Sequence, residues 1–252
     1  MKTMVPLLAC LSCQALAHSW VERMNTAKEG QLQLASVGYA RGNVLRTDSS
    51  FKDEAMTYLL PPDGRNTVLP TDHLCSVAQR QPCQTADSPR LRVRGNETVV
   101  LQWNENGHIT KPWNNPPGKN GSGEVYVYGT NQSSPSDVLQ AIHHVWATDG
   151  QGGDGRGRLL YHGPFDDGEC YQYGDDVVSY SAIASARAKD HPGPGASDPA
   201  QGLNLWCKAN VALPVLPTNT TYTLYWIWDW PFTSREAPAQ LYTTCMDVDI
   251  VT

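Results

Sequence analysis

No segment after the first seventeen residues is long and apolar enough to cross a membrane, and the chain contains no internal repeat, low-complexity linker or appended module. The apolar run near the start, MVPLLACLSC, is too short to span a bilayer. Basic residues are also scarce, with 19 Lys and Arg against 25 Asp and Glu, which gives a formal net charge of -6. We therefore expect no nucleic-acid partner, no membrane partner, and a released protein whose ligand is neutral or insoluble.

The first seventeen residues have the features of a secretion signal. Lys2 supplies a positive start, the apolar run follows, and the tripeptide ALA at 15–17 matches the pattern that signal peptidase cleaves. Cleavage after 1–17 predicts a secreted, extracellular protein with a single domain over 18–252 and His18 as its first residue. The amine and the imidazole of a terminal histidine can bind one metal ion together, and nitrogen-rich sites suit Cu(II).

The cysteine spacings do not resemble a zinc site, because no close pair is matched by a second close pair or by paired histidines. Five cysteines follow the signal, an odd number that predicts two disulfides and one free thiol. They are Cys75, Cys83, Cys170, Cys207 and Cys245. Glycosylation sequons begin at Asn96, Asn120, Asn131 and Asn219 and predict a glycoprotein.

Short aromatic and β-branched segments, separated by Gly- and Pro-rich stretches, indicate strands and not helices. The expected strands are 97–103, 123–129, 138–147, 205–213, 221–229 and 241–251. Polar loops fill 104–122 and 149–158, and 175–190 is the one helix-like run. This spacing predicts an all-β fold, an immunoglobulin/fibronectin-III-like antiparallel β-sandwich with long loops.

The two-residue period of a strand assigns side chains to faces. In 221–229 it places Trp226 and Trp228 on one face, where core packing is the first interpretation and a substrate platform the second. In the last strand it directs Val248 to the core and Asp247 to solvent.

A three-nitrogen site at His18 needs a second histidine. The candidates are His73, His108, His143, His144, His162 and His191. His108 is favoured because it directly follows an expected strand, on a loop that a sheet holds in place; the alternative is a surface histidine. His143 and His144 are expected mid-strand, on opposite faces, where they cannot serve one metal.

The segment APAQLYTTCMDVDIV resembles the closing segment of the lytic polysaccharide monooxygenases, above all the fungal cellulose-active family, which ends in Gln-x-Tyr-x-x-Cys and an alternating strand. Gln240, Tyr242 and Cys245 match that pattern. VALPVLPTNTTYTLYWIWDW, and VVLQWNENGHITKPW followed by GEVYVYG, look like further parts of the family. The region 40–95 matches poorly.

The resemblance implies one copper ion per chain, bound by the amine and imidazole of His18 and the imidazole of His108, with Tyr242 in the axial position. Gln240 lies on the same face as Tyr242 and is implied to hydrogen-bond an oxygen co-substrate. The implied activity is that of a monomeric copper monooxygenase or peroxygenase that cleaves glycosidic bonds of cellulose, xylan-coated cellulose or another wall glucan. It draws on an external electron donor and on O2 or H2O2. A core role for Tyr242 and a solvated edge position for Gln240 are the structural alternatives.

The chain also departs from the family. The usual further histidine before Gln-x-Tyr is absent, and Asp229 or Arg235 is the candidate replacement, which indicates a divergent or distinct family. The family's last cysteine bridges to the long early loop, which implies Cys245 with Cys75 or Cys83, and Cys170 with Cys207. The alternative functions are copper acquisition by a histidine brace without oxidative activity, and a wall-binding sandwich without metal.

Overall fold

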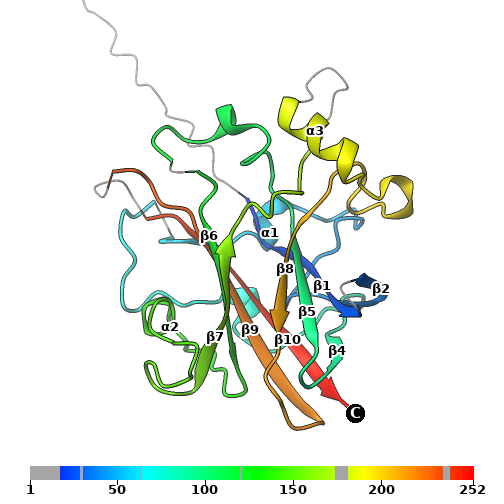
Figure 1. Cartoon of the computed structure of the whole chain (residues 1–252). Helices are drawn as coiled ribbons and strands as arrows, with labels where there is room; N and C mark the ends of the chain where they lie inside the picture. The colour runs from blue at the N-terminus through cyan, green and yellow to red at the C-terminus, as the bar shows by residue number, and fades with distance from the viewer. Residues whose placement is uncertain (1–17, 29–30, 63, 120, 174–180, 235–238) are drawn as a thin grey trace, which may run out of the picture.

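The computed structural model describes residues 18–28, 31–62, 64–119, 121–173, 181–234 and 239–252 as an all-β sandwich of two sheets (Figure 1). The strands are β1 (Val21–Lys28), β2 (Gln31–Gly38), β3 (Leu59–Leu60), β4 (Leu91–Arg94), β5 (Thr98–Trp103), β6 (Glu124–Thr130), β7 (Gly157–Pro164), β8 (Cys207–Ala212), β9 (Thr220–Asp229) and β10 (Leu241–Val251). The helices are α1 (Asp53–Met56), α2 (Leu139–Ile142) and α3 (Ala182–Asp190), with 3-10 turns η1 (Val77–Gln79), η2 (Pro112–Asn114) and η3 (Gly195–Ser197).

The smaller sheet has the order β2-β1-β5-β8, and the larger has β3-β10-β9-β6-β7 with β4 beside β10. All strand pairs are antiparallel except β4 with β10. The antiparallel, immunoglobulin-like sandwich is therefore confirmed, with one parallel pair added. Figure 1 shows α3 and the loop that carries η2 at the end of the sandwich opposite the C-terminus.

The inner faces of the two sheets meet through large aromatic side chains. Trp103 of β5 packs on Trp226 of β9, with 5.8 Å between ring centroids. Trp226, Trp228 and Trp230 are fully buried in this main core, so the core interpretation of the tryptophans is confirmed. Alternate residues of β9, such as Ile227, belong to a second cluster on the outer face of the larger sheet. Burial on both faces explains why the segment LYWIW at 224–228 of β9 is an unbroken apolar run.

The expected strand at 138–147 is wrong, because this segment forms α2 and a turn. Its buried side chains are Leu139, Ile142 and Trp146, a three-and-four spacing that is typical of a helix. Strands β1, β2, β3, β4 and β7 were not predicted; β1 carries charged residues such as Glu22, which is buried against Arg46. Of the expected helix at 175–190, residues from Ala182 onward are helical, and 174–180 lie outside the described residues.

Asp247 contradicts the prediction that it faces solvent, although Val248 is buried as expected. The Asp247 carboxylate is fully buried and accepts hydrogen bonds from Arg41 Nε (2.8 Å) and Nη2 (2.6 Å). Thr223 donates a third hydrogen bond at 2.8 Å. The loop that carries Arg41 covers this end of the larger sheet, so the nominal outer face is buried as well.

Disulfides join Cys75 to Cys245 and Cys170 to Cys207, and Cys83 is a free, exposed thiol. The predicted two disulfides and one free thiol are confirmed, and Cys75 is the partner of Cys245. None of the helices in the described part of the chain has the length and apolar character needed to cross a membrane. The expected signal at 1–17 lies outside the described residues.

Candidate functional site

A buried carboxylate shapes the loop that follows β5. The side chain of Glu105 accepts hydrogen bonds from the backbone N–H groups of Ile109 (2.7 Å) and Thr110 (3.3 Å) and from the Thr110 hydroxyl. Burial raises the pKa of the Glu105 carboxyl, and these hydrogen bonds act in the opposite direction. The backbone N–H of His108 donates to the Glu105 carbonyl at 2.9 Å, which closes the turn. His108 is consequently 9% exposed and is not a surface loop residue.

Asn115 holds His108 at two points. Its amide group donates to the His108 carbonyl oxygen at 2.9 Å, and its Oδ1 lies 3.0 Å from His108 Nδ1. Because the amide N–H groups face the carbonyl, Oδ1 acts as the acceptor and the ring proton belongs on Nδ1. Burial lowers the pKa of His108 to about 4, so the imidazole is neutral near pH 7. A neutral ring with its proton on Nδ1 presents the lone pair of Nε2 to a metal.

Aromatic side chains from the end of β9 form the wall beside His108. The His108 ring lies 4.8 Å from Trp230 and 5.5 Å from Trp228, measured between centroids. Tyr242 pairs with Trp228 across β9 and β10, and its ring stacks on Trp228 at 5.1 Å. Trp228 therefore contacts both His108 and Tyr242, two of the residues that the sequence predicted for one site.

Gln240 and Tyr242 lie on the same face, as the strand period predicted. Gln240 Nε2 donates a hydrogen bond to the Tyr242 hydroxyl at 2.8 Å. Both residues are buried, so the edge position considered for Gln240 is wrong. Gln240 Oε1 is buried and has no hydrogen-bond partner among the described residues. The Gln240 amide therefore donates to the Tyr242 hydroxyl and keeps its own Oε1 available as an acceptor.

His18 is half-buried and begins the described chain. Hydrogen bonds hold the residues after His18 against both sheets. Ser19 Oγ donates to the Asn104 carbonyl at 2.8 Å, and the N–H of Val21 donates to Thr244 Oγ1 at 3.2 Å. Burial is the main cause of the lowered pKa of His108, and the charge of His18 contributes to it. The free amine depends on cleavage before His18, which stays a prediction.

An open pocket of about 610 Å³ adjoins His108. It is lined by His108, Ile109, Pro112, Trp113, Asn115, Pro116, Pro117, Gly118, Lys119, Gly121, Ser122 and Asp166. Burial lowers the pKa of Lys119 to about 7, and the charge of Asp229 opposes this shift. Lys119 Nζ donates to the Trp230 carbonyl at 2.6 Å. The ammonium is thus held at the end of the aromatic wall.

Neither candidate for the missing second histidine is placed at this site. Arg235 lies outside the described residues. The Asp229 side chain leaves the face of β9 opposite to Trp228 and lies against His143 and His144. Asn115, Glu105 and Lys119 were missed by the sequence analysis. Glu105 and Asn115 belong to the polar run NENGHITKPWNN, which has no periodicity to assign roles, and Lys119 lies beyond that run.

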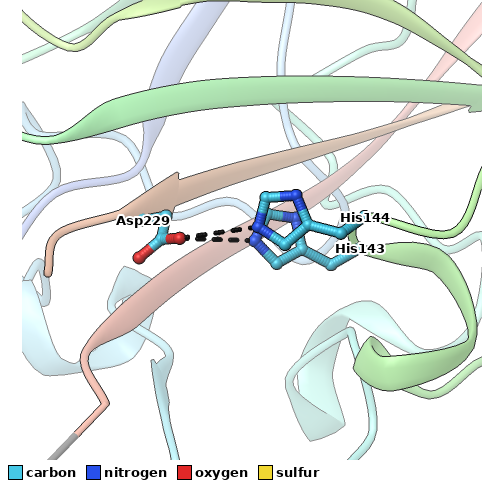
Figure 2. Close-up of side chains that lie close together, drawn as sticks. All are labelled: His143, His144 and Asp229. Carbon is cyan, nitrogen blue, oxygen red and sulfur yellow. Dashed lines mark ion pairs between the residues drawn. The ribbon is translucent and has the colours of Figure 1, made fainter. Parts of the chain in front are cut away.

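His143 and His144 correct another prediction. They lie on one side of the turn after α2, with ring centroids 3.8 Å apart, and both face Asp229 (Figure 2). His144 has a φ of 61°, so the chain does not follow the alternation of a strand here. The remaining histidines lie elsewhere: His73 in a bridge with Val138, His162 stacked on Tyr126, and His191 3.9 Å from Glu169.

A family model and distantly similar solved structures each match nearly the whole chain. No curated protein matches it. Among solved structures, HiLPMO9B is 12% identical with a TM-score of 0.38, over 93% of this chain and 79% of that one. A cellulose-active polysaccharide monooxygenase from M. thermophila is 11% identical with a TM-score of 0.33, over 93% and 78%. At these values we transfer no residue role from either structure. A family model described as a domain of unknown function (DUF7492) matches residues 15–252, and the chain belongs to that family.

Proposed function

We propose that this protein is a secreted copper-dependent monooxygenase or peroxygenase that cleaves glycosidic bonds of a polysaccharide oxidatively. The observation that carries the proposal is His108, which is buried, with its Nδ1 proton directed to Asn115 and its Nε2 lone pair available. The Gln240–Tyr242 pair lies on the same aromatic wall, through Trp228. The motif resemblance in the last strand supports the same assignment.

The donor set fits copper. The residues that would hold it are His18, through its amine and imidazole, His108, through Nε2, and Tyr242, through its hydroxyl. Metal binding requires unprotonated ligands, and the low pKa of His108 meets that requirement down to mildly acidic pH. Copper supplies one-electron redox chemistry with an external donor and the activation of O2 or H2O2.

The chain's own residues then have definable tasks. Trp228 and Trp230 are fully buried and exclude water from one side of His108. Gln240 fixes the Tyr242 hydroxyl and presents a second polar atom to a small oxygen co-substrate. Lys119, whose pKa is about 7, can give and take a proton near neutral pH at the edge of the wall.

A polysaccharide is the substrate class that the surface around His108 favours. Trp113 lies in the adjoining pocket and is 67% exposed, so its indole offers an apolar face to the C–H groups of a sugar ring. The net negative charge argues against a polyanionic polymer. Neutral plant or fungal wall glucans, cellulose and xylan-coated cellulose among them, are the substrates to test.

Copper acquisition without turnover is the second candidate, because it uses the same three nitrogens. The resemblance separates the two functions: carriers of this type generally lack the axial tyrosine and the nearby glutamine. Here both are buried and hydrogen-bonded to each other, which favours the enzyme.

The decisive experiment compares protein that begins at His18 with a form that carries one extra alanine before it. The added residue converts the amine to an amide, so Cu(II) affinity is expected to fall by orders of magnitude. With a reductant and O2 or H2O2, the His18 form is expected to release oxidised oligosaccharides from at least one neutral wall polymer. Equal copper affinity of the two forms refutes the brace. Tight copper binding without oxidised products from any polymer supports acquisition instead.

A further inference from the structure

The outer face of the larger sheet carries a second cluster of metal-ligand side chains. His143 and His144 follow α2, and Asp229 ends β9 (Figure 2). The Nε2 atoms of the two histidines lie 3.6 Å and 3.8 Å from the same Asp229 oxygen. One ligand atom from each of the three residues falls within 4.8 Å of the others. Both histidine rings thus direct Nε2 toward one carboxylate from the same side.

The surroundings of the His143 ring are an independent indication that this cluster binds a ligand. Its side chain is 7% exposed, and Nε2 is buried without a hydrogen-bond partner in the described part of the chain. Buried polar atoms are ordinarily paired, and the distance to Asp229 is too long for a hydrogen bond. The atom faces Asp229 beside His144, the position that a ligand of a shared cation would take.

The Tyr128 hydroxyl contacts both His143 and His144 and orients them. It lies 3.2 Å from His143 Nδ1 and accepts a hydrogen bond from the backbone N–H of His144 at 3.0 Å. An outer partner on the second ring nitrogen is the usual support of a metal-binding histidine, because it fixes the ring and leaves the other nitrogen to the metal.

The neighbouring charges suit a cation. Glu124 pairs with Asp229 across β6 and β9, and its carboxylate accepts hydrogen bonds from Tyr126 (2.9 Å) and faces His162 Nε2 (3.1 Å). The Tyr126 ring contacts both His143 and His144 edge-on at 4.8 and 4.9 Å. The positive charge of the Lys119 ammonium opposes cation binding, but this group is held at the Trp230 carbonyl. Two carboxylates therefore lie near two imidazoles.

We propose that His143, His144 and Asp229 bind a zinc ion, at a site separate from His18 and His108. Zinc takes histidine nitrogen at about 2.0–2.1 Å in tetrahedral geometry, which separates ligand atoms by about 3.3 Å. The 3.6 and 3.8 Å distances require a closure of only a few tenths of an ångström. His144 is 57% exposed, so the fourth position is open to water. The ion fastens the turn after α2 to the end of β9.

The test removes the proposed copper site first, so that failure of one proposal is distinct from failure of the other. The background protein carries an added alanine before His18 and His108→Ala, and zinc is titrated into the metal-free form by calorimetry. We expect one zinc ion per chain and a raised thermal unfolding midpoint with zinc. Asp229→Asn and His144→Gln are expected to weaken binding at least about 100-fold, since even outer partners of a ligand are worth about 10- to 100-fold.

His191→Gln is the matched control, because it removes a surface histidine beside Glu169 and is expected to leave zinc affinity unchanged. Asp229 and His144 are partly exposed, so both variants are expected to fold, and circular dichroism checks this. Absence of zinc binding to the background protein overturns the proposal. Unchanged affinity in both folded variants overturns it as well.

Discussion

Replacing Asn115 by leucine tests the central feature of the proposed copper site, the fixed tautomer of His108. Leucine keeps the approximate volume and removes both hydrogen bonds, the one at His108 Nδ1 (3.0 Å) and the one at its carbonyl oxygen (2.9 Å). The ring is then free to carry its proton on Nε2, where it competes with the metal. Outer partners of a metal-binding histidine are typically worth about 10- to 100-fold in affinity, or about 1.4–2.8 kcal/mol.

The assay is competitive titration of Cu(II) against a chelator at pH 7, together with the copper EPR spectrum. Protein stability is measured in parallel by urea unfolding, because two buried polar groups lose their partners, at roughly 1–3 kcal/mol for each unsatisfied group. Trp113→Ala is the matched control: it alters the same pocket without a contact to His108 and is expected to leave copper affinity unchanged. If folded Asn115→Leu binds copper as tightly as the wild type, with the same spectrum, Asn115 does not prepare His108 for a metal.

Four further outcomes are expected. Gln240→Ala keeps copper affinity within about tenfold but loses roughly 10²–10³ in oxidised-sugar release, with a smaller loss for Tyr242→Phe; equal activity of all three proteins contradicts the role of the pair. Trp113→Ala weakens adsorption to the insoluble substrate in a pull-down assay, and unchanged adsorption removes it from the binding face. Asp247→Ala lowers the free energy of unfolding by about 3–5 kcal/mol because Arg41 is left buried and unpaired, whereas Asp249→Ala costs less than about 1 kcal/mol in the same urea titration. Folding lowers the pKa of His108 from 6.5 to about 4. The contribution of His108 to the free energy of unfolding is therefore present above pH 6.5 and is lost toward pH 4, by up to about 3 kcal/mol. His108→Asn is expected to abolish that part of the pH dependence of unfolding.

The sequence predicted the strands best where one face is apolar over many residues. The segments 221–229 and 241–251 match β9 and β10 to within one residue, because aromatic and β-branched side chains alternate there without interruption. The same alternation placed Trp226 and Trp228 on one face of their strand, and Gln240 and Tyr242 on one face of the last strand. It failed at 138–147, where a helical spacing was hidden within a run of mixed apolar and polar residues.

The remaining features depend on contacts that no local pattern records. Asp247 is buried because Arg41 reaches it from a loop 206 residues away in sequence. The partners of His108 are close in sequence, but Asn115 reaches it only because the buried carboxylate of Glu105 folds the loop back. His143 and His144 share a face because one residue adopts a left-handed conformation, which composition alone does not indicate.

The end of β9 links the two proposed metal sites without merging them. Trp228 points into the main core, toward His108 and Tyr242, while Asp229 points to the outer face, toward His143 and His144. Adjacent residues of a strand face opposite sides, so a side-chain change at one position leaves the other wall intact. Loss of zinc in Asp229→Asn therefore reports on the outer face, although the charge of Asp229 also acts on Lys119 in the pocket beside His108. The proposed copper site and the proposed zinc site accordingly lie on opposite faces of the larger sheet, although consecutive residues of β9 contribute to both.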